Sequence, residues 1–261
     1  MLHLGDKSPD VLSWQCQLVA LGAQLTVDGV FGQRTHNATL AFQASRGLPT
    51  TGEVGPEEFK RAAAGELPDR LPPVLANSIP FVEARHYNHA ARNSIELIVL
   101  HSMEAAETST TAESCAHYLA TLPLDTTKKK SCHYCVDSDS VVQCVPDHMI
   151  AYAAPGANSS GLHIELAGFA RQSREEWFDA YGTRMLGLCG QLIARLCKRW
   201  KIPPTIVRAP GLLQRQRGIT THALVNEAFR QSDHTDPGPG FPLEEVVRLA
   251  AIQLQALGGT V

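Results

Sequence analysis

The apolar residues in the first quarter of the chain recur at the three- and four-residue spacing of amphipathic helices. This pattern predicts a first helix behind Ser8, a second over about residues 33–46 and a third that begins at Pro56. We expect the second helix to bury a face that includes Ala41 and Phe42. The pattern therefore predicts a small three-helix module.

Two glycine turns precede the second and third predicted helices and form a weak internal repeat. Their sequences are DGVFG over residues 28–32 and TGEVG over residues 51–55. Each has one apolar residue directly before its second glycine, Phe31 in the first turn and Val54 in the second. We interpret these residues as apolar plugs that anchor the turns to the core.

Beyond residue 95, short apolar runs alternate with longer helical stripes. Strands are predicted over residues 95–100, 131–136, 141–145, 162–166 and 205–207. A long helical stripe runs from Trp177 to Trp200, and a closing helix is predicted over residues 243–257. This alternation predicts an α/β fold in which a mixed central β-sheet is flanked by helices.

A proline-rich stretch separates the two patterns. Proline removes backbone donors and favours extended chain, so residues 66–80 are predicted to be a linker. The expected organisation is a helical module over residues 1–65, this linker, and a larger domain over residues 81–261.

Composition excludes several classes of protein. The chain has 261 residues with 44% hydrophobic content, enough for a packed core, and a formal charge of −3 without a basic stripe. No apolar run approaches the roughly 18 residues of a membrane span. The first residues show no secretory signal. We expect no nucleic-acid partner, no membrane insertion and a monomeric protein.

Seven cysteines, an odd number, favour reduced thiols buried as small hydrophobic side chains. Cys132 and Cys135 form a CxxC pair with Cys144 nearby, which also invites a metal or redox interpretation. On a regular strand, Cys132 and Cys135 would point to opposite faces. The structural interpretation is therefore favoured for these cysteines.

Three segments of the larger domain carry candidate chemistry. His101 ends the most apolar strand, although a histidine there is often a satisfied core residue. Strand alternation places His163 and Glu165 on one face of the strand predicted over residues 162–166, and a carboxylate there must be paired, protonated or functional. The third segment contains His222 and then the sequence DHTDPGPGFP, whose prolines would hold Asp236 in place; the alternative is a solvated acidic turn.

The N-terminal residues resemble a peptidoglycan-binding module. The resemblance covers about residues 2–64 and rests on the order DGVFG, Thr35, Phe42-Gln43 and GLPTTGEVG. It implies a three-helix fold, in which most of these residues form turns and core.

The larger domain resembles the zinc-dependent N-acetylmuramoyl-L-alanine amidases, a family that includes phage endolysins and peptidoglycan recognition proteins. Five segments match in the family's order: IVLHSM, SCHYCVDSDSVVQCV, GLHIELAG, GITTHAL and HTDPGPGFP. They span about residues 81–242. One departure is Tyr152, which stands where relatives often carry a substrate-side histidine.

The resemblance implies roles for five residues. His101, His222 and Asp236 match the three ligands of a catalytic Zn²⁺ site that keeps a position for water. Glu165 matches the acidic residue that takes the proton of the attacking water and passes it to the leaving nitrogen. His234 would help to stabilise the oxyanion. Six further histidines could line the groove: His86, His89, His117, His133, His148 and His163.

The function that follows is hydrolysis of the amide bond between N-acetylmuramic acid and the L-alanine of the stem peptide. The partner is peptidoglycan, through both its glycan strand and its stem peptide. A non-catalytic peptidoglycan receptor of the same fold and a zinc peptidase that cuts within the stem peptide are the alternatives. We expect synthesis in the cytoplasm and action on the cell wall after release through a holin or a dedicated secretion route.

Overall fold

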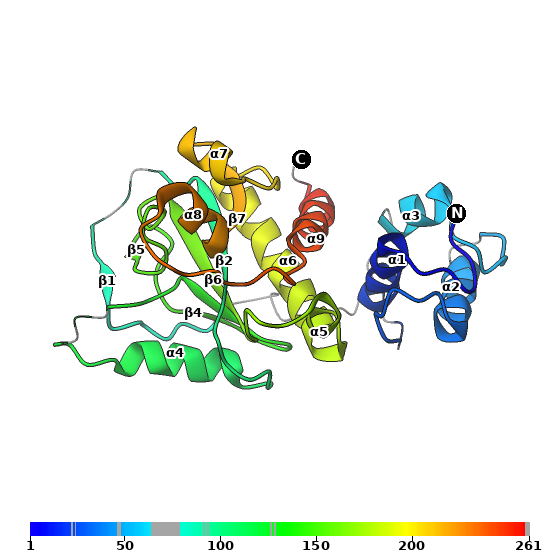
Figure 1. The fold of residues 1–261 in the computed structure, drawn as a ribbon, viewed down its shortest axis with the longest axis horizontal. Helices are drawn as coiled ribbons and strands as arrows, with labels where there is room; N and C mark the ends of the chain where they lie inside the picture. Colours follow the sequence, from blue (N-terminus) through cyan, green and yellow to red (C-terminus); the bar gives the residue numbers. More distant parts are fainter. Residues whose placement is uncertain are drawn as a thin grey trace. The chain divides into compact units, whose positions relative to one another are not determined.

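The computed structural model describes residues 1–63 and 79–258, apart from residues 22, 24, 46, 47, 91, 93, 126 and 128 (Figure 1). The chain divides into two compact units. Met1–Pro73 and Glu175–Arg184 form one, and Val74–Arg174 with Met185–Val261 form the other. The predicted linker over residues 66–80 lies outside the described residues up to residue 78, so the predicted domain boundaries stay a prediction.

The N-terminal module consists of three helices. They are α1 (Pro9–Ala20), α2 (Gln33–Ser45) and α3 (Pro56–Ala63). The side chain of Ser8 caps α1 by accepting a hydrogen bond from the N–H of Val11 at 3.2 Å. All three helices begin where the sequence predicts.

The core of this module is built around Trp14, which is fully buried. The rings of Phe42 and Phe59 pack edge-on against it, with centroids 5.2 and 5.3 Å away. The indole N–H donates to the hydroxyl of Thr39 at 2.8 Å, so the one polar group of the tryptophan is satisfied.

Two buried glutamines hold the two glycine turns in equivalent ways. The side-chain amide of Gln15 donates to the carbonyl of Val30 (3.0 Å) and accepts from the N–H of Gly29 (2.8 Å). Gln43 donates to the carbonyl of Glu53 (2.8 Å) and accepts from the N–H of the glycine before it (2.9 Å). The internal repeat is therefore a repeat of turns, each pinned by one glutamine.

The two predicted plugs of these turns, Phe31 and Val54, are fully buried, in line with that interpretation. The predicted buried face of α2 is wrong at Ala41, which is exposed. Polar residues such as Thr35 and Gln43 are buried on α2 instead. The hydroxyl of Thr35 donates to the turn carbonyl of Val30, and the side-chain oxygen of Gln43 accepts from the N–H of Gly52.

We expect Gln15→Ala to lower the free energy of unfolding of this module by about 2 kcal/mol, because the change leaves buried turn groups without partners. Gln33→Ala is the matched control, since Gln33 is exposed on the same module; its effect should stay within about 0.5 kcal/mol. Calorimetry of the full chain measures both variants. Equal stability of the two variants would contradict the role given to Gln15.

The larger unit contains a five-stranded sheet with the order β4-β3-β6-β2-β7. Its strands are β2 (Leu97–Ser102), β3 (Tyr134–Val136), β4 (Val141–Gln143), β6 (Gly161–Leu166) and β7 (Gly218–Thr221). Strands β3, β6, β2 and β7 run parallel to one another. Strand β4 pairs with β3 and adds an antiparallel edge. Strands β1 (Tyr87–Asn88) and β5 (Ile150–Ala151) form a separate antiparallel pair.

Helices cover both faces of the sheet, with α4 on one side and α6 with α9 on the other (Figure 1). The bounds are α4 (Thr111–Thr121), α5 (Arg174–Trp177), α6 (Ala180–Trp200), α7 (Ala209–Leu213), α8 (His222–Phe229) and α9 (Leu243–Ala256). Helix α9 approaches α6 closely at Gly190, where a Cβ atom would lie 2.9 Å from that of Leu249. This arrangement confirms the predicted fold class, a mixed sheet flanked by helices.

Two predicted strands differ most from the observed ones. The strand predicted over residues 205–207 is wrong, because Ile206 forms only an isolated bridge to Ile219 and β7 occupies the sheet position. The strand predicted over residues 131–136 begins only at Tyr134. The predicted long helical stripe is also interrupted, since α5 ends before α6 begins.

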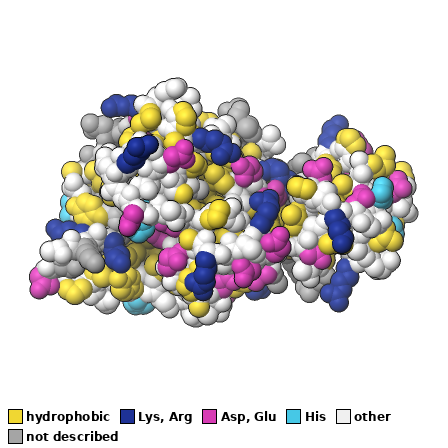
Figure 2. All heavy atoms as spheres, viewed as in Figure 1, with side chains coloured by type: hydrophobic (Ala, Val, Ile, Leu, Met, Phe, Trp, Pro, Cys, Tyr) yellow, Lys and Arg dark blue, Asp and Glu magenta, His cyan; other side chains and the backbone are white. Residues whose placement is uncertain are grey.

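Surface charge on this molecule is mixed. On the face shown in Figure 2, basic and acidic side chains are interspersed and apolar side chains lie between them. The longest described helix, α6, has 21 residues, and neither it nor any other described helix has the apolar length to cross a membrane.

Candidate metal centre and active site

Three neighbouring parallel strands bring three predicted site residues into one row. His101, near the end of β2, pairs in register with Glu165 on β6. On the other side of β2, Leu100 pairs with Thr221, the last residue of β7, and His222 follows directly. Ligand sites in open α/β sheets lie at the carboxyl ends of the strands, which is where this row lies.

Asp236 reaches the row from the loop that follows α8. Its backbone carbonyl accepts a hydrogen bond from the N–H of Ala223 at 2.9 Å. Two residues on, Gly238 has φ +87°, and a Cβ atom there would lie 1.8 Å from the carbonyl oxygen of Ala170. Only glycine fits this close approach. The loop is thus fixed at two points, and the Asp236–Pro237 peptide bond between them is cis.

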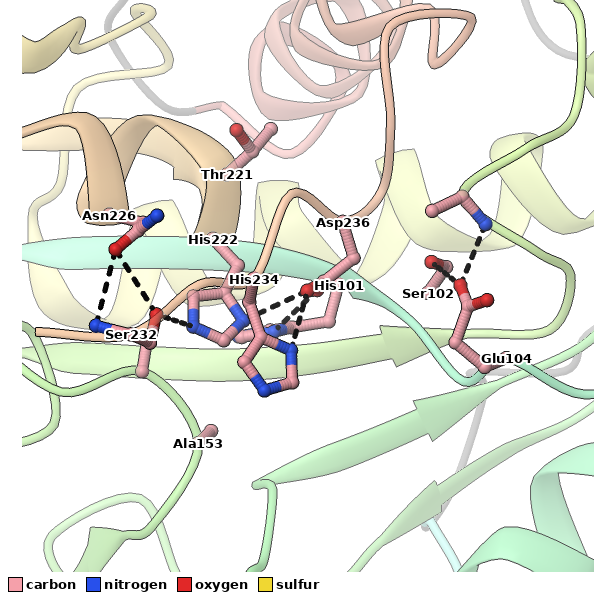
Figure 3. Close-up of polar contacts among 12 residues, drawn as sticks. His101, Ser102, Glu104, Ala153, Thr221, His222, Asn226, Ser232, His234 and Asp236 are labelled. Carbon is pink, nitrogen blue, oxygen red and sulfur yellow. Dashed lines mark hydrogen bonds and ion pairs between the residues drawn. The ribbon is translucent and has the colours of Figure 1, made fainter. Parts of the chain in front are cut away.

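The carboxylate of Asp236 contacts three imidazole rings (Figure 3). Its Oδ2 lies 3.1 Å from Nδ1 of His101, and its Oδ1 lies 3.0 Å from Nδ1 of His222. Nδ1 of His234 is 3.3 Å from the same Oδ1, but this side chain is 61% exposed. His101, His222 and Asp236 are all buried, and we call these three residues the His-His-Asp cluster.

The electrostatics of the cluster favour a neutral imidazole beside an ionised carboxylate. Burial lowers the pKa of His101. Burial alone would raise the pKa of Asp236, but the hydrogen bonds from His101 and His222 outweigh it and hold that pKa well below its usual range. Metal ligands bind in these deprotonated forms.

The two buried imidazoles of the cluster also have second partners. Nε2 of His101 lies 3.1 Å from Nδ1 of His163, and Nε2 of His222 lies 3.4 Å from the hydroxyl of Ser232. The Ser232 hydroxyl in turn contacts the side-chain oxygen of Asn226 at 3.3 Å (Figure 3). Contacts of this kind fix the orientation of ligand rings in metal sites.

The cluster lies in the wall of a cavity of about 720 Å³. All five predicted site residues line it: His101, Glu165, His222, His234 and Asp236. Tyr152 and Asn158 also contribute to the wall. The described lining residues include none of the six histidines that could line the groove: His86, His89, His117, His133, His148 and His163.

The sequence did not predict that His163 and Ser232 contact the His-His-Asp cluster. His163 contacts the ring of His101 and does not line the cavity. The sequence feature that could have indicated this contact is its place on the same strand face as Glu165. Ser232 had no comparable signal, because its contact with His222 depends on the path of a loop.

Glu165 lines the cavity, and one of its two carboxylate oxygens lacks a hydrogen-bond partner among the described residues. Its Oε2 atom is buried and has no hydrogen-bond partner among the described residues. Burial, followed by the nearby thiol of Cys115 and the carboxylate of Asp236, raises its pKa well above the usual range. A carboxyl group in this environment exchanges a proton closer to neutral pH than an ordinary glutamate does.

Comparison with known families agrees with this geometry. Residues 91–239, more than half of the chain, match the family model of N-acetylmuramoyl-L-alanine amidase. The chain belongs to this amidase family. Residues 7–61 match the model of a peptidoglycan binding domain. The chain thus combines an amidase domain with an N-terminal module that matches a peptidoglycan-binding family.

The fold also occurs in a solved structure of low sequence identity. The Staphylococcus aureus hydrolase AmiA, solved with its ligand, is 14% identical, with 70% of this chain and 87% of that chain covered and a TM-score of 0.54. The amidase LysC from Clostridium intestinale is 16% identical, with 70% and 100% covered and a TM-score of 0.40. No curated protein sequence matches this chain significantly.

The raised pKa of Glu165 makes the stability of the metal-free amidase depend on pH. The unfolded chain releases this proton around a pKa of about 4.3, whereas burial makes the folded protein release it only at a higher pH. Stability of the wild type should therefore fall as pH rises above about 4.3, and Glu165→Gln should remove this loss. We expect the variant to gain stability relative to wild type as the pH rises from 4 to 7.

Thermal unfolding of chelated protein across this pH range checks this prediction. Glu104→Gln is the matched control, since Glu104 lines the same cavity but is exposed. A stability difference between Glu165→Gln and wild type that stays constant with pH would contradict the prediction.

Proposed function

We propose that the protein is a zinc-dependent hydrolase of the amide bond between N-acetylmuramic acid and the L-alanine of the peptidoglycan stem peptide. The observation that carries this proposal is the His-His-Asp cluster beside the half-buried Glu165 in one cavity. Membership of the N-acetylmuramoyl-L-alanine amidase family supports the choice of this amide as the bond that is cleaved.

The donor set of the cluster fits Zn²⁺. It offers two imidazole nitrogens and one carboxylate oxygen, all within 4.8 Å of one another. Three protein ligands of this kind are typical of catalytic zinc sites, whereas structural sites usually have four. When bound there, Zn²⁺ would lower the pKa of water toward about 7 and polarise the amide carbonyl.

In the proposed reaction, Glu165 moves the protons. Its carboxylate accepts a proton from the attacking water and delivers it to the nitrogen of the leaving L-alanine. Its position in register with His101 places it beside the cluster, and its raised pKa suits a group that must both accept and return a proton.

His234 is proposed to stabilise negative charge that develops on the carbonyl oxygen. It stands at the mouth of the cavity, where its exposed ring stacks on His222 with centroids 4.7 Å apart and an interplanar angle of 13°. The contact of its Nδ1 with Asp236 orients the ring.

The N-terminal module is proposed to bind peptidoglycan and so to hold the catalytic unit near an insoluble substrate. Tethering raises the local substrate concentration and increases avidity without new contacts at the active site. We further propose that the protein acts as a monomer in cell-wall lysis, after release from the cytoplasm through a holin or a dedicated secretion route.

Product analysis by mass spectrometry tests which bond is cleaved. A muropeptide incubated with the protein should yield a glycan with an intact lactyl acid and a free stem peptide that begins with L-alanine. A peptidase would leave L-alanine attached to the glycan. A non-catalytic receptor would release neither product, and either of these results would contradict the proposal.

A further inference from the structure

Three buried cysteines converge beside the active-site cavity. Sγ of Cys135 lies 3.5 Å from Sγ of Cys132 and 3.7 Å from Sγ of Cys144. All three sulfur atoms lie within 4.8 Å of one another, and none of the residues is more than 1% exposed. We call these three residues the thiol cluster.

The path of the backbone explains why these sulfurs meet. Alternation along a regular strand would separate Cys132 from Cys135, but β3 begins only at Tyr134, so Cys132 precedes the strand. Cys144 follows β4, and its N–H donates to the carbonyl of His133 at 2.8 Å. The expectation that Cys132 and Cys135 face apart is therefore wrong.

The spacing of the sulfurs fits a shared metal ion. Zinc–sulfur bonds of about 2.3 Å in a tetrahedral site place neighbouring sulfurs about 3.8 Å apart. The two shortest separations in the thiol cluster, 3.5 and 3.7 Å, lie close to this value. A disulfide bond of about 2.05 Å would join only two of the three and leave one buried thiol over.

A fourth thiol lies at the open side of the cluster. Cys115, on α4, interacts with the thiol of Cys135 and packs against the same buried group of side chains. It is half-buried and lines the cavity together with Cys132, which gives an ion a route from solvent.

We propose that the three sulfur atoms of the thiol cluster bind one soft divalent metal ion, of which Zn²⁺ fits best, with Cys115 beside the fourth coordination position. Sulfur ligands select such ions, and four-coordinate sulfur sites are typical of structural zinc. The site is separate from the His-His-Asp cluster. It ties α4 to β3 and to the end of β4, and Cys135 pairs in register with Glu165, so the ion would brace the wall that carries Glu165.

Cobalt(II) titration of the reduced, metal-free full-length protein tests this site. A thiolate bound to Co²⁺ gives a charge-transfer absorption in the near ultraviolet, and the His-His-Asp cluster contains no sulfur. We expect this band to saturate at one equivalent per chain. We also expect the wild-type protein to bind one more Co²⁺ ion per chain than the Cys144→Ala variant.

Three variants make the test specific. Cys144→Ala should lose the band, while Cys189→Ala, which removes a fully buried cysteine of α6 outside the cluster, should keep it. His222→Ala should also keep it, so the result does not depend on the proposed amidase activity. Absence of the band in folded, reduced wild type would overturn the proposal even if Cys144→Ala failed to fold. A band that persists in Cys144→Ala would overturn it as well.

Discussion

Glu165→Gln is expected to lower the rate of amide cleavage by about 10²- to 10⁴-fold, the range that positioned general bases contribute. The amide side chain has nearly the same size but cannot accept the proton of the attacking water. Because Glu165 is not part of the His-His-Asp cluster, metal content should stay unchanged. Rate measurements on a soluble muropeptide, combined with elemental analysis of the same sample, check both parts of this prediction.

Glu104→Gln is the matched control for this variant. Glu104 lines the same cavity, is exposed, and accepts hydrogen bonds from the hydroxyl of Ser102 (2.8 Å) and the N–H of Ala170 (2.7 Å), which a glutamine oxygen can also accept. Its cleavage rate should stay close to wild type. If Glu165→Gln cleaved at the rate of Glu104→Gln, the proton-transfer role of Glu165 would be wrong.

Asp236→Asn is expected to remove both metal binding at the cluster and cleavage. The change keeps the size of the side chain but removes the charge that compensates a cation beside His101 and His222. Loss of a hydrogen-bonding partner behind a ligand costs about 10- to 100-fold in metal affinity or activity. Loss of the ligand charge itself should cost more.

Ser232→Ala provides a graded comparison for this second prediction. It removes only the partner of Nε2 of His222, so its effect should fall within the range of about 10- to 100-fold. Competition with a chelator measures the zinc affinity of both variants, and muropeptide cleavage measures their rates. An Asp236→Asn protein that binds zinc as tightly as Ser232→Ala would show that Asp236 is not a ligand.

Much of the fold was predictable because its signals are local. The buried strand that ends near His101 and the strand that carries Glu165 are short apolar runs with clear limits. Parallel pairing then places their carboxyl ends together. The glycine and proline residues around Asp236 also mark a fixed loop, and the close approach of Gly238 to Ala170 shows what the first of these glycines is needed for.

Other features depend on contacts that a sequence pattern does not record. The buried side of α2 includes Gln43, whose polarity hides it from a hydrophobic pattern although it is fully buried. Strand β7 has four residues and begins at a glycine, so its apolar signal is weak. The convergence of Cys132 and Cys135 depends on a strand that begins two residues after the first of them.

The most direct test of the central claim is the release of N-terminal L-alanine from purified cell walls, measured before chelation, after chelation and after zinc is returned. The account predicts release by the untreated protein, loss of release after chelation, and recovery with Zn²⁺ in the wild type but not in Asp236→Asn. Release that continues unchanged in the fully chelated protein would contradict a metal-dependent amidase at the His-His-Asp cluster.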